Sequence, residues 1–410
     1  MKPLMELDEV LALLLAGANP VSQSEMVSTF DCVGRVLAQP QYSAINVPPL
    51  DNSSMDGYAV RCADIAAVGT ILPVSQRIPA GKVGAPLTAG TVARIFTGAP
   101  VPPGADAVVM QEDVTLVDGK VTFNALPVPG AWIRKAGEDI YTGGEVLMRG
   151  TRLRPQEAGL AASVGLAFLP VFRPVRVALF STGDELVMPG EPLPQGAIYN
   201  SNRFMLKGLL ESLGCDVVDF GIVPDKLPAT RAALRKAAGK HKVDLILTSG
   251  GVSMGEEDHI KPAVEAEGSL DHWLVNSKPG RPFAFGRVIT ALNESAFIGL
   301  PGNPVSSFVT FLLLVRPFIR KLQGMDVGVS NALPKGLMLR AGFDLLKSDR
   351  RREFLRARVG QDGLLELFPN QSSGVLTSAA WAEGLIDNPA GSIIKRGDSV
   401  RFIPFSELLT

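Results

Sequence analysis

The sequence has little of what would mark a disulfide scaffold, a zinc site or a nucleic-acid-binding surface. Its 410 residues include three cysteines and three histidines, and the formal net charge is −1. The cysteines are odd in number, far apart and without zinc spacing, which favours a reducing compartment over a disulfide framework. The near-neutral charge leaves no basic excess for nucleic acid or a membrane surface. We therefore expect a cytoplasmic protein whose partners are small molecules or other proteins.

Long apolar runs are also absent. Residues 11–15 and 308–315 form the most apolar runs, far short of the roughly 20 residues that a bilayer span requires. Acidic residues at 6, 8 and 9 stand where a signal peptide would be basic and then apolar, so we expect a helix whose leucines face a neighbour. With 46% hydrophobic residues, the chain can form packed cores, and its length predicts about two to four domains.

The residue composition and periodicity of the sequence change three times along the chain. Strands alternating with helices over 174–323 predict βαβ units and a mostly parallel sheet. Segments rich in Gly, Pro, Val and Thr predict β-domains before and after it. The expected fold is multidomain α/β plus β, with a mostly helical N-terminal or linker domain (1–42 and 144–173), an inserted β-domain (43–143), the α/β domain (174–323) and a small barrel-like C-terminal β-domain (324–410).

Chemically useful side chains follow nearly every predicted strand of the α/β region. In open α/β sheets, ligands bind outside the carboxyl ends of the strands. Helix capping would explain any one of these loops, but it explains all five poorly. The residues concerned are Glu185, Asp225, Ser249, Gly250, Gly251, Ser253, Asp258, Lys278, Arg281, Pro301, Gly302 and Asn303.

Together these loops predict a site for an anion and a divalent cation. Glycines at 250, 251 and 302 allow backbone N–H groups to approach a ligand closely. Lys278 and Arg281 supply positive charge for a phosphate or another oxyanion. The carboxylates of Glu185, Asp225 and Asp258 are hard oxygen ligands suited to Mg²⁺. The sequence contains neither GxxxxGK[ST] nor a GxGxxG after a strand, which disfavours a P-loop ATPase and a dinucleotide dehydrogenase.

The predicted β-domain carries a second set of candidates. Thr97 and Gly98 fall in a tight turn. Asp56 lies in the loop "DNSSMDGYAV", which contains two acids although a turn needs only one Asp or Asn. The stretch "IRKAGEDI" ends in Asp139, and by itself it reads more simply as a solvated turn of mixed charge.

Together these segments resemble the bacterial MoeA family of molybdopterin molybdenumtransferases. The matching segments occur in order over most of the chain, whereas the C-terminal domain resembles the family only in its strand-like sequence pattern. The segments that carry it are "PPLDNSSMDGYAVR" (48–61), "RIFTGAPVPPGADAVVMQED" (94–113), "RKAGEDI" (134–140), "VALFSTGDEL" (177–186), "IYNSNRFML" (198–206), "DLILTSGGVSMGEED" (244–258), "KPGRPFAFG" (278–286) and "GLPGNPVSS" (299–307).

The resemblance implies a reaction and a quaternary structure. The family is an elongated four-domain homodimer, with a site shared between the α/β domain of one subunit and the β-domain of the other. It moves molybdenum from molybdate to the dithiolene of adenylyl-molybdopterin and releases AMP, with Mg²⁺ assisting. Expected protein partners are the molybdopterin adenylyltransferase, which supplies the substrate, and molybdenum enzymes.

The resemblance also implies roles for single residues. Asp56 matches the family's essential acid, Thr97 a site threonine, and Asp139 the rim of the β-domain. Glu185, Asp225 and Asp258 match the acidic side of the α/β pocket, and Lys278 and Arg281 match its basic side. Arg281 stands where many relatives have Lys. Arginine keeps the positive charge, but its planar guanidinium presents hydrogen-bond donors in a forked arrangement. We expect Asp51, the second acid of the loop, to shape the loop by bonding backbone N–H groups.

Two other functions stay open at this point. An adenylyltransferase acting on the same pterin shares the α/β domain but would lack the domain with "DNSSMDGYAV". A non-catalytic scaffold would not need Asp56. A preference for tungstate over molybdate is also open, because the two oxyanions are nearly alike in size and charge.

Overall fold

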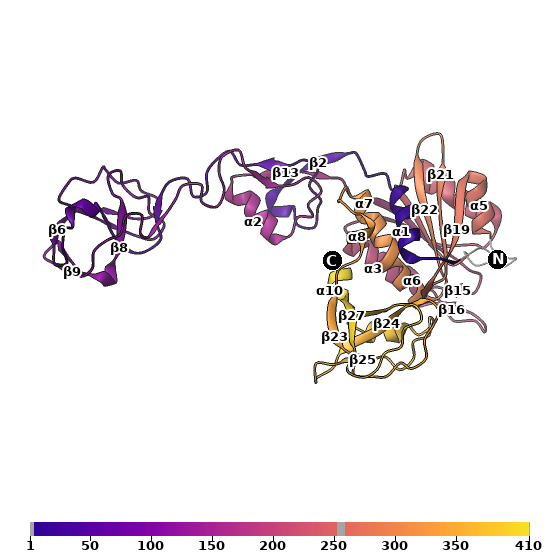
Figure 1. Cartoon of the computed structure of the whole chain (residues 1–410). Coiled ribbons are helices and arrows are strands. Elements are labelled where there is room, and N and C mark those ends of the chain that lie inside the picture. Colours follow the sequence, from indigo (N-terminus) through magenta and orange to yellow (C-terminus); the bar gives the residue numbers. More distant parts are fainter. Residues whose placement is uncertain (1–3, 252–258, 410) are drawn as a thin grey trace.

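The computed structural model describes residues 4–251 and 259–409. The α/β and C-terminal domains lie together at one end of an elongated molecule, and the inserted β-domain lies at the other end (Figure 1). In the described part of the chain, no helix combines the length and the apolar character that crossing a membrane requires.

Seven strands of the described residues form the sheet of the α/β domain. Their order is β1-β19-β21-β22-β18-β14-β17, and only β21 runs antiparallel to its neighbours. The predicted mostly parallel sheet is therefore confirmed. The strands are β1 (Leu4–Met5), β14 (Arg176–Thr182), β17 (Asp216–Val223), β18 (Leu245–Ser249), β19 (Gly268–Val275), β21 (Pro282–Ile289) and β22 (Glu294–Leu300).

Helices cover both faces of this sheet. Alternate residues of a strand point to opposite faces, so Val177 and Leu179 pack with α1, α3, α6 and α7, while Ala178 and Phe180 pack with α4 and α5. Burial on both faces explains why β14 reads as one continuous apolar run. The helices are α1 (Leu7–Ala16), α3 (Ser201–Ser212), α4 (Leu227–Arg235), α5 (Ile260–Glu267), α6 (Pro304–Thr310), α7 (Arg316–Leu322) and α8 (Val329–Ala332).

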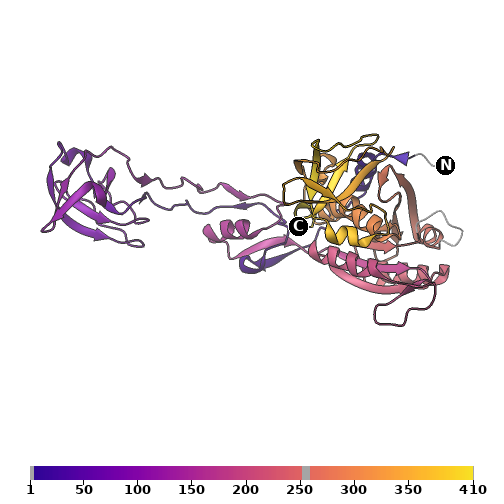
Figure 2. The same cartoon turned by 90° about the horizontal axis from the view of Figure 1, so that it is seen from below.

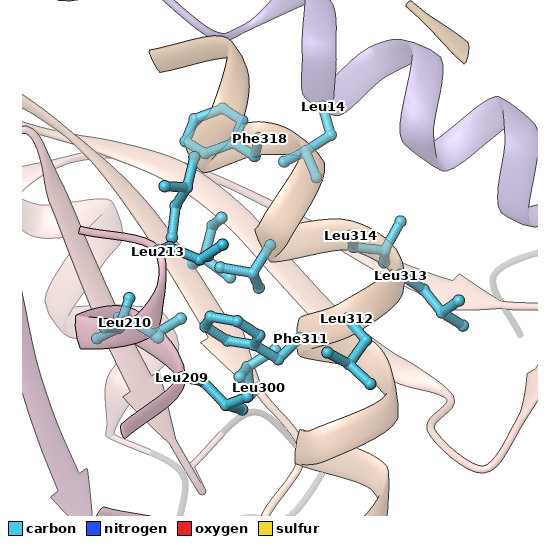
Figure 3. Packing of buried hydrophobic residues seen from close by; sticks show 14 of the residues in the cluster. Leu14, Leu209, Leu210, Leu213, Leu300, Phe311, Leu312, Leu313, Leu314 and Phe318 are labelled. Carbon is cyan, nitrogen blue, oxygen red and sulfur yellow. The ribbon is translucent and has the colours of Figure 1, made fainter. Parts of the chain in front are cut away.

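The largest core lies between α1, α3 and the helical run over 304–322 (Figure 3). Within that run, α6 and α7 continue into each other through a π-helical turn, Phe311–Val315. Leu14 of α1 and Phe318 of α7 are both fully buried in this core. Helix α1 therefore packs with the α/β domain.

The prediction that residues 1–42 are mostly helical is wrong beyond Ala16. Strand β2 (Ser24–Ser28) pairs with β13 (Phe168–Phe172), and β3 (Gln41–Tyr42) pairs with β12 (Glu145–Leu147). The segment 24–28 gains its backbone hydrogen bonds from a strand about 140 residues away, a partner that local periodicity cannot reveal. The exact domain borders stay a prediction.

The β-domain is inserted between outgoing and returning strands, as expected. Figure 2 shows the two segments running side by side between the domains. Strand β4 (Asn52–Ser53) leads out and pairs with β11 (Ile133–Arg134), which leads back. Helix α2 (Pro155–Ser163) packs beside the β2–β13 pair, and Ala161 of α2 shares an apolar cluster with Val27 and Leu169.

The β-domain itself contains a sheet of six strands among the described residues. Their order is β8-β5-β7-β6-β10-β9, with apolar clusters of side chains at both faces. The strands are β5 (Gly57–Val60), β6 (Ile71–Ile78), β7 (Val92–Ile95), β8 (Ala107–Met110), β9 (Val114–Val117) and β10 (Lys120–Phe123).

The C-terminal domain is barrel-like. Strand β25 pairs with β24, and a bridge between Ala341 and Leu365 brings the far edge of the sheet back to β25. Strand β20 belongs in sequence to the α/β region but pairs with β24. The elements are β20 (Ser277–Lys278), β23 (Leu337–Arg340), β24 (Arg352–Val359), β25 (Leu365–Leu367), β26 (Gly384–Asn388), β27 (Ser399–Pro404), α9 (Leu376–Trp381) and α10 (Phe405–Leu408).

Packing of α1 predicts a large difference between two adjacent leucines. Leu14 is fully buried, whereas Leu13 is 48% exposed. We expect Leu14→Ala to lower the free energy of unfolding by about 2–5 kcal/mol, because a cavity forms where the side chain is lost. Leu13→Ala is the matched control and should change it by less than about 1 kcal/mol. Urea unfolding measures both, and equal losses would contradict the placement of α1.

Candidate active site

Three loops at the carboxyl edge of the sheet line one cavity. Strands β14, β18 and β22 are parallel neighbours, so the segments that follow them meet at the same edge. We call this space, of about 580 Å³, the sheet-edge cavity. It is lined by Thr182, Glu185, Leu186, Ile198, Tyr199, Asn200, Ser201, Asn202, Ser249, Gly250, Gly302, Asn303, Pro304 and Gly374. The structure thus brings together Glu185, Ser249, Gly250, Gly302 and Asn303 from the predicted set.

Gly250 is required at this edge for steric reasons. Its φ is +87°, and an added Cβ would come within 2.8 Å of the carbonyl oxygen of Thr182. Its N–H donates to the carbonyl of Leu300 at 3.1 Å. The expectation that this N–H approaches a ligand is therefore wrong, because the group is used in joining β18 to β22.

A second cavity adjoins the first and is basic. It shares Gly302 and Asn303 with the sheet-edge cavity and contains the predicted Lys278, Arg281 and Pro301. The basic cavity is lined by Lys278, Pro279, Gly280, Arg281, Pro282, Pro301, Gly302, Asn303, Ser306, Arg351, Gln371, Ser372 and Ser373. The Nε of Arg281 is buried and has no hydrogen-bond partner among the described residues.

Lys278 is held by carboxylates of the C-terminal domain. Its Nζ lies 2.9 Å from Glu353 and 3.1 Å from Asp349. Burial lowers the pKa of Lys278, but the hydrogen bonds to these carboxylates outweigh burial and leave the pKa above its usual value. Asp349 also binds Arg351, whose hydrogen bond is the main reason that the pKa of Asp349 lies well below its usual range. The charge of Lys278 is therefore largely balanced within the protein.

The predicted residues of the β-domain form a separate group. Asp56 precedes β5 and Thr97 follows β7, and these strands pair with Gly57 opposite Ile95. Asp56 accepts hydrogen bonds from the Thr97 N–H at 2.8 Å and hydroxyl at 2.7 Å. These bonds, the backbone one first, hold the pKa of Asp56 below its usual value. The side chain is an anion at neutral pH, suited to accept a proton or bind a cation.

Gly98, Asp51 and Asp139 are the other candidate residues in this part of the chain. Gly98 has a φ of +79°, and its N–H donates to the carbonyl of Ser53 at 2.8 Å. Asp51 accepts from the Ala136 N–H and pairs with Lys135, both at 2.8 Å, which gives it the predicted role of shaping the loop. Asp139 is exposed, and its N–H donates to the carbonyl of Val47.

Several predicted residues are not brought into either cavity. Ser253 and Asp258 lie outside the described residues. Asp225 and Gly251 are described but line neither cavity. Within residues 4–251 and 259–409, no three His, Cys, Asp or Glu side chains cluster as a metal site would require. The predicted trio of metal ligands stays a prediction, because Asp258 lies outside the described residues.

Sequence reasoning missed the contribution of the C-terminal domain. Arg351, Gln371, Ser372 and Ser373 line the basic cavity although they follow Lys278 by more than 70 residues. They were missed because the sequence pattern of this domain predicted only β-strands and gave no sign that its loops reach the α/β sheet. Asn200 and Asn202 were also given no role, although both occur in the quoted segment "IYNSNRFML".

The fold is that of a multidomain protein whose α/β domain has two adjoining cavities at the carboxyl edge of its sheet. Family models match the chain in order: "MoeA N-terminal region (domain I and II)" over 5–165, "Probable molybdopterin binding domain" over 178–321 and "MoeA C-terminal region (domain IV)" over 339–405.

Full-length relatives identify the family. The chain is 38% identical to the molybdopterin molybdenumtransferase of Haemophilus influenzae, covering 99% of this chain and 100% of that protein. It is 36% identical to molybdopterin molybdenumtransferase 2 of Mycobacterium tuberculosis, covering 95% and 96%. The crystal structure of the molybdopterin biosynthesis moeA protein from Pyrococcus horikoshii OT3 superposes with a TM-score of 0.83 at 30% identity, covering 98% and 100%. The chain belongs to the MoeA family.

The network around Lys278 predicts an acid-dependent loss of stability. The folded pKa of Asp349 lies below its unfolded value of about 3.9, so its stabilising contribution is present above that value and is lost as pH falls toward the folded pKa. We expect Asp349→Asn to lower the free energy of unfolding at pH 7 by about 1–2 kcal/mol, a modest value because the side chain is partly exposed.

Urea unfolding between pH 7 and pH 3 measures this effect. The difference between the variant and the wild type should begin to shrink below about pH 4, where the unfolded carboxyl becomes protonated. A difference that is constant over the whole range would contradict the assignment. Asp362→Asn, which alters an exposed carboxylate of the same domain, is the control.

Proposed function

We propose that this chain inserts molybdenum from molybdate into adenylyl-molybdopterin, releasing AMP and forming molybdenum–molybdopterin, as a molybdopterin molybdotransferase. The observation that carries the proposal is the pair of adjoining cavities, one basic and one without basic side chains, in a chain that covers the whole length of the Haemophilus influenzae molybdenumtransferase. Nothing in that similarity favours a lone adenylyltransferase or a scaffold.

The basic cavity suits an oxyanion of the reaction. Molybdate is a dianion, and the pyrophosphate of the substrate is also anionic. Lys278, Arg281 and Arg351 bring three cations to this cavity, and Asp349 and Glu353 offset two of them. The remaining charge favours an anion, and the buried Nε of Arg281 gains a partner when an anion binds.

Cleavage of the pyrophosphate requires positioning and neutralisation of charge. Glu185 lines the sheet-edge cavity, and Asp225 follows β17, the strand beside β14. Mg²⁺ commonly uses one or two carboxylates together with substrate phosphates, so the Glu185 carboxylate on the cavity wall would hold the ion with those phosphates, and Asp225 is assigned to the same acidic side. When bound, Mg²⁺ would offset the charge that develops on the phosphate oxygens.

Asp56 completes the site from a second subunit. In one chain, the β-domain lies at the opposite end of the molecule from the α/β domain (Figure 1). A homodimer that places the β-domain of one subunit over the cavities of the other brings the Asp56 carboxylate, held by Thr97, to the substrate. The anionic state of Asp56 suits it as a base or as a ligand for a cation.

An exposed apolar face offers a contact for this dimer. Phe30 is 93% exposed, and Met26 on β2 and Phe168 on β13, the paired strands of the linker domain, are also exposed. Beside Phe30 is a groove whose α2 wall consists of small residues, Ala158, Gly159 and Ala162. Exposed apolar surfaces of this kind mark protein–protein contacts. The remaining parts of the proposal are a cytoplasmic location and exchange of substrate and product with an adenylyltransferase and molybdenum enzymes.

We predict that Asp56→Ala abolishes AMP release without unfolding the protein, because the side chain is partly exposed and its partners are confined to Thr97. The assay mixes purified protein, adenylyl-molybdopterin and molybdate and measures AMP, with tungstate in a parallel arm. Asp118→Asn, in the β9–β10 turn of the same domain, should keep wild-type activity. Normal AMP release by Asp56→Ala would remove this residue from the chemistry.

A mixture of inactive variants tests the shared site. Glu185→Ala should be inactive like Asp56→Ala, because each lesion lies on a different side of the same composite site. After subunit exchange in equal amounts, about a quarter of the sites in a two-fold dimer carry neither lesion. We therefore expect about a quarter of wild-type AMP release from the mixture. No recovery after verified exchange would show that both residues act within one subunit.

We further predict that Phe30→Asp shifts the protein from dimer to monomer and lowers AMP release with it. The charge would have to be buried in the apolar contact. Sedimentation velocity measures the mass, and Val117→Asp, which alters an exposed apolar residue of the β-domain hairpin, is the matched control. A Phe30→Asp dimer as stable as the wild type would exclude this face.

A further inference from the structure

Two asparagines at the start of α3 line the sheet-edge cavity. Asn200 is 1% exposed and Asn202 is 9% exposed. Buried amides normally have all their polar atoms hydrogen-bonded. These two do not, and neither has a part in the oxyanion chemistry assigned above.

The orientation of each amide is fixed by its hydrogen bonds. The Oδ1 of Asn200 accepts from the N–H of Arg203 at 3.2 Å, which caps α3, and from the hydroxyl of Ser181 at 3.5 Å. The Nδ2 of Asn202 donates to the carbonyl of Gly302 at 2.7 Å. Asn200 is therefore left with a donor, its Nδ2, and Asn202 with an acceptor, its Oδ1.

These remaining atoms have no hydrogen-bond partner in the described part of the chain. The same is true of the hydroxyl of Thr182, the last residue of β14 and a third residue of the cavity lining. An unsatisfied buried polar group is costly to a fold. Three such groups around one cavity indicate that a ligand, rather than the protein, supplies their partners.

The surroundings disfavour a phosphate group as the direct partner of these three polar atoms. Among the described residues that line the sheet-edge cavity there is no Lys or Arg, and Glu185 contributes a negative charge. The apolar side chains of Leu186, Ile198 and Tyr199 line the same space. A donor, an acceptor and apolar walls suit a flat, uncharged ring with polar edges.

We propose that Asn200, Asn202 and Thr182 form the recognition edge for an amino-substituted nitrogen heterocycle. Asn200 Nδ2 donates to a ring nitrogen or carbonyl of the heterocycle, and Asn202 Oδ1 accepts from its exocyclic amino group. The inference rests on the proposed function, because adenylyl-molybdopterin carries two such rings, an adenine and a pterin. With a ring in the sheet-edge cavity, the attached phosphates extend past Gly302 and Asn303 into the basic cavity.

Replacement of the donor at position 200 tests the proposal directly. Asn200→Asp keeps the oxygen that caps α3, since Asp is as good a cap as Asn, but it puts an acceptor in place of the free Nδ2. Calorimetric titration with adenosine and with neopterin, both uncharged, measures binding and distinguishes the two rings. We expect about 10-fold or greater weakening for the ring that occupies the cavity. Unchanged affinity for both rings, or no binding of either to the wild type at millimolar concentration, would overturn the proposal.

Thr182→Val provides a second test that does not depend on a folding defect. Valine has nearly the same shape and removes a hydroxyl that has no partner, so the urea midpoint should stay the same or rise. Affinity for the same ring should fall several-fold. Thr248→Val is the matched control, because the Thr248 hydroxyl is equally buried and unpartnered but does not line the cavity. Equal effects of the two substitutions on binding would contradict the recognition edge.

Failure of the proposed function gives a different result. If wild-type protein releases AMP from adenylyl-molybdopterin but Asn200→Asp binds both rings normally, the recognition edge is wrong and the function stands. If the variant loses affinity for a ring while the wild type releases no AMP, the edge stands and the function is wrong.

Discussion

The ion pairs between Lys278 and two carboxylates of the C-terminal domain join that domain to the α/β domain at the basic cavity. Strand β20 leaves the α/β region and becomes an edge of the C-terminal sheet, with Lys278 directly opposite Glu353. Glu353 is almost fully buried, and a buried carboxylate without a cation would be strongly destabilising. The pairing therefore fixes the C-terminal domain against the sheet. As a result, Arg351 and the serines at 372 and 373 line the basic cavity.

This arrangement also explains why the cavity is basic without being strongly charged. Three cations at one place would repel one another, and each would be costly to desolvate. Asp349 and Glu353 offset that repulsion, while Arg281 keeps an unused donor. The adjoining sheet-edge cavity keeps polar atoms unsatisfied in the same way. Both cavities thus carry a cost in stability that a bound ligand would relieve, as is common where a site is organised before its ligand arrives.

Much of the fold could be predicted from the sequence because the relevant signals are local. Continuous apolar runs marked the central strands, and the segments after them contained the glycines and polar residues of the sheet-edge cavity. The same reasoning failed for 17–42, where exposed short strands carry no clear period and obtain their partners from 145–172. Asp56 could be singled out by family resemblance, but its pairing with Thr97 depends on the alignment of β5 with β7.

The sequence by itself determined the kinds and order of the elements in the α/β domain and the chemistry placed at the ends of its central strands. These features depend on residues within one strand or loop, whose spacing is visible in the chain. Only the tertiary structure decided that Arg351 and residues 371–373 border the basic cavity, that Gly250 uses its N–H within the sheet, and that two amides keep a free donor and a free acceptor. Each of those facts depends on which distant backbone or side chain becomes a neighbour, and that choice is made by packing the whole chain.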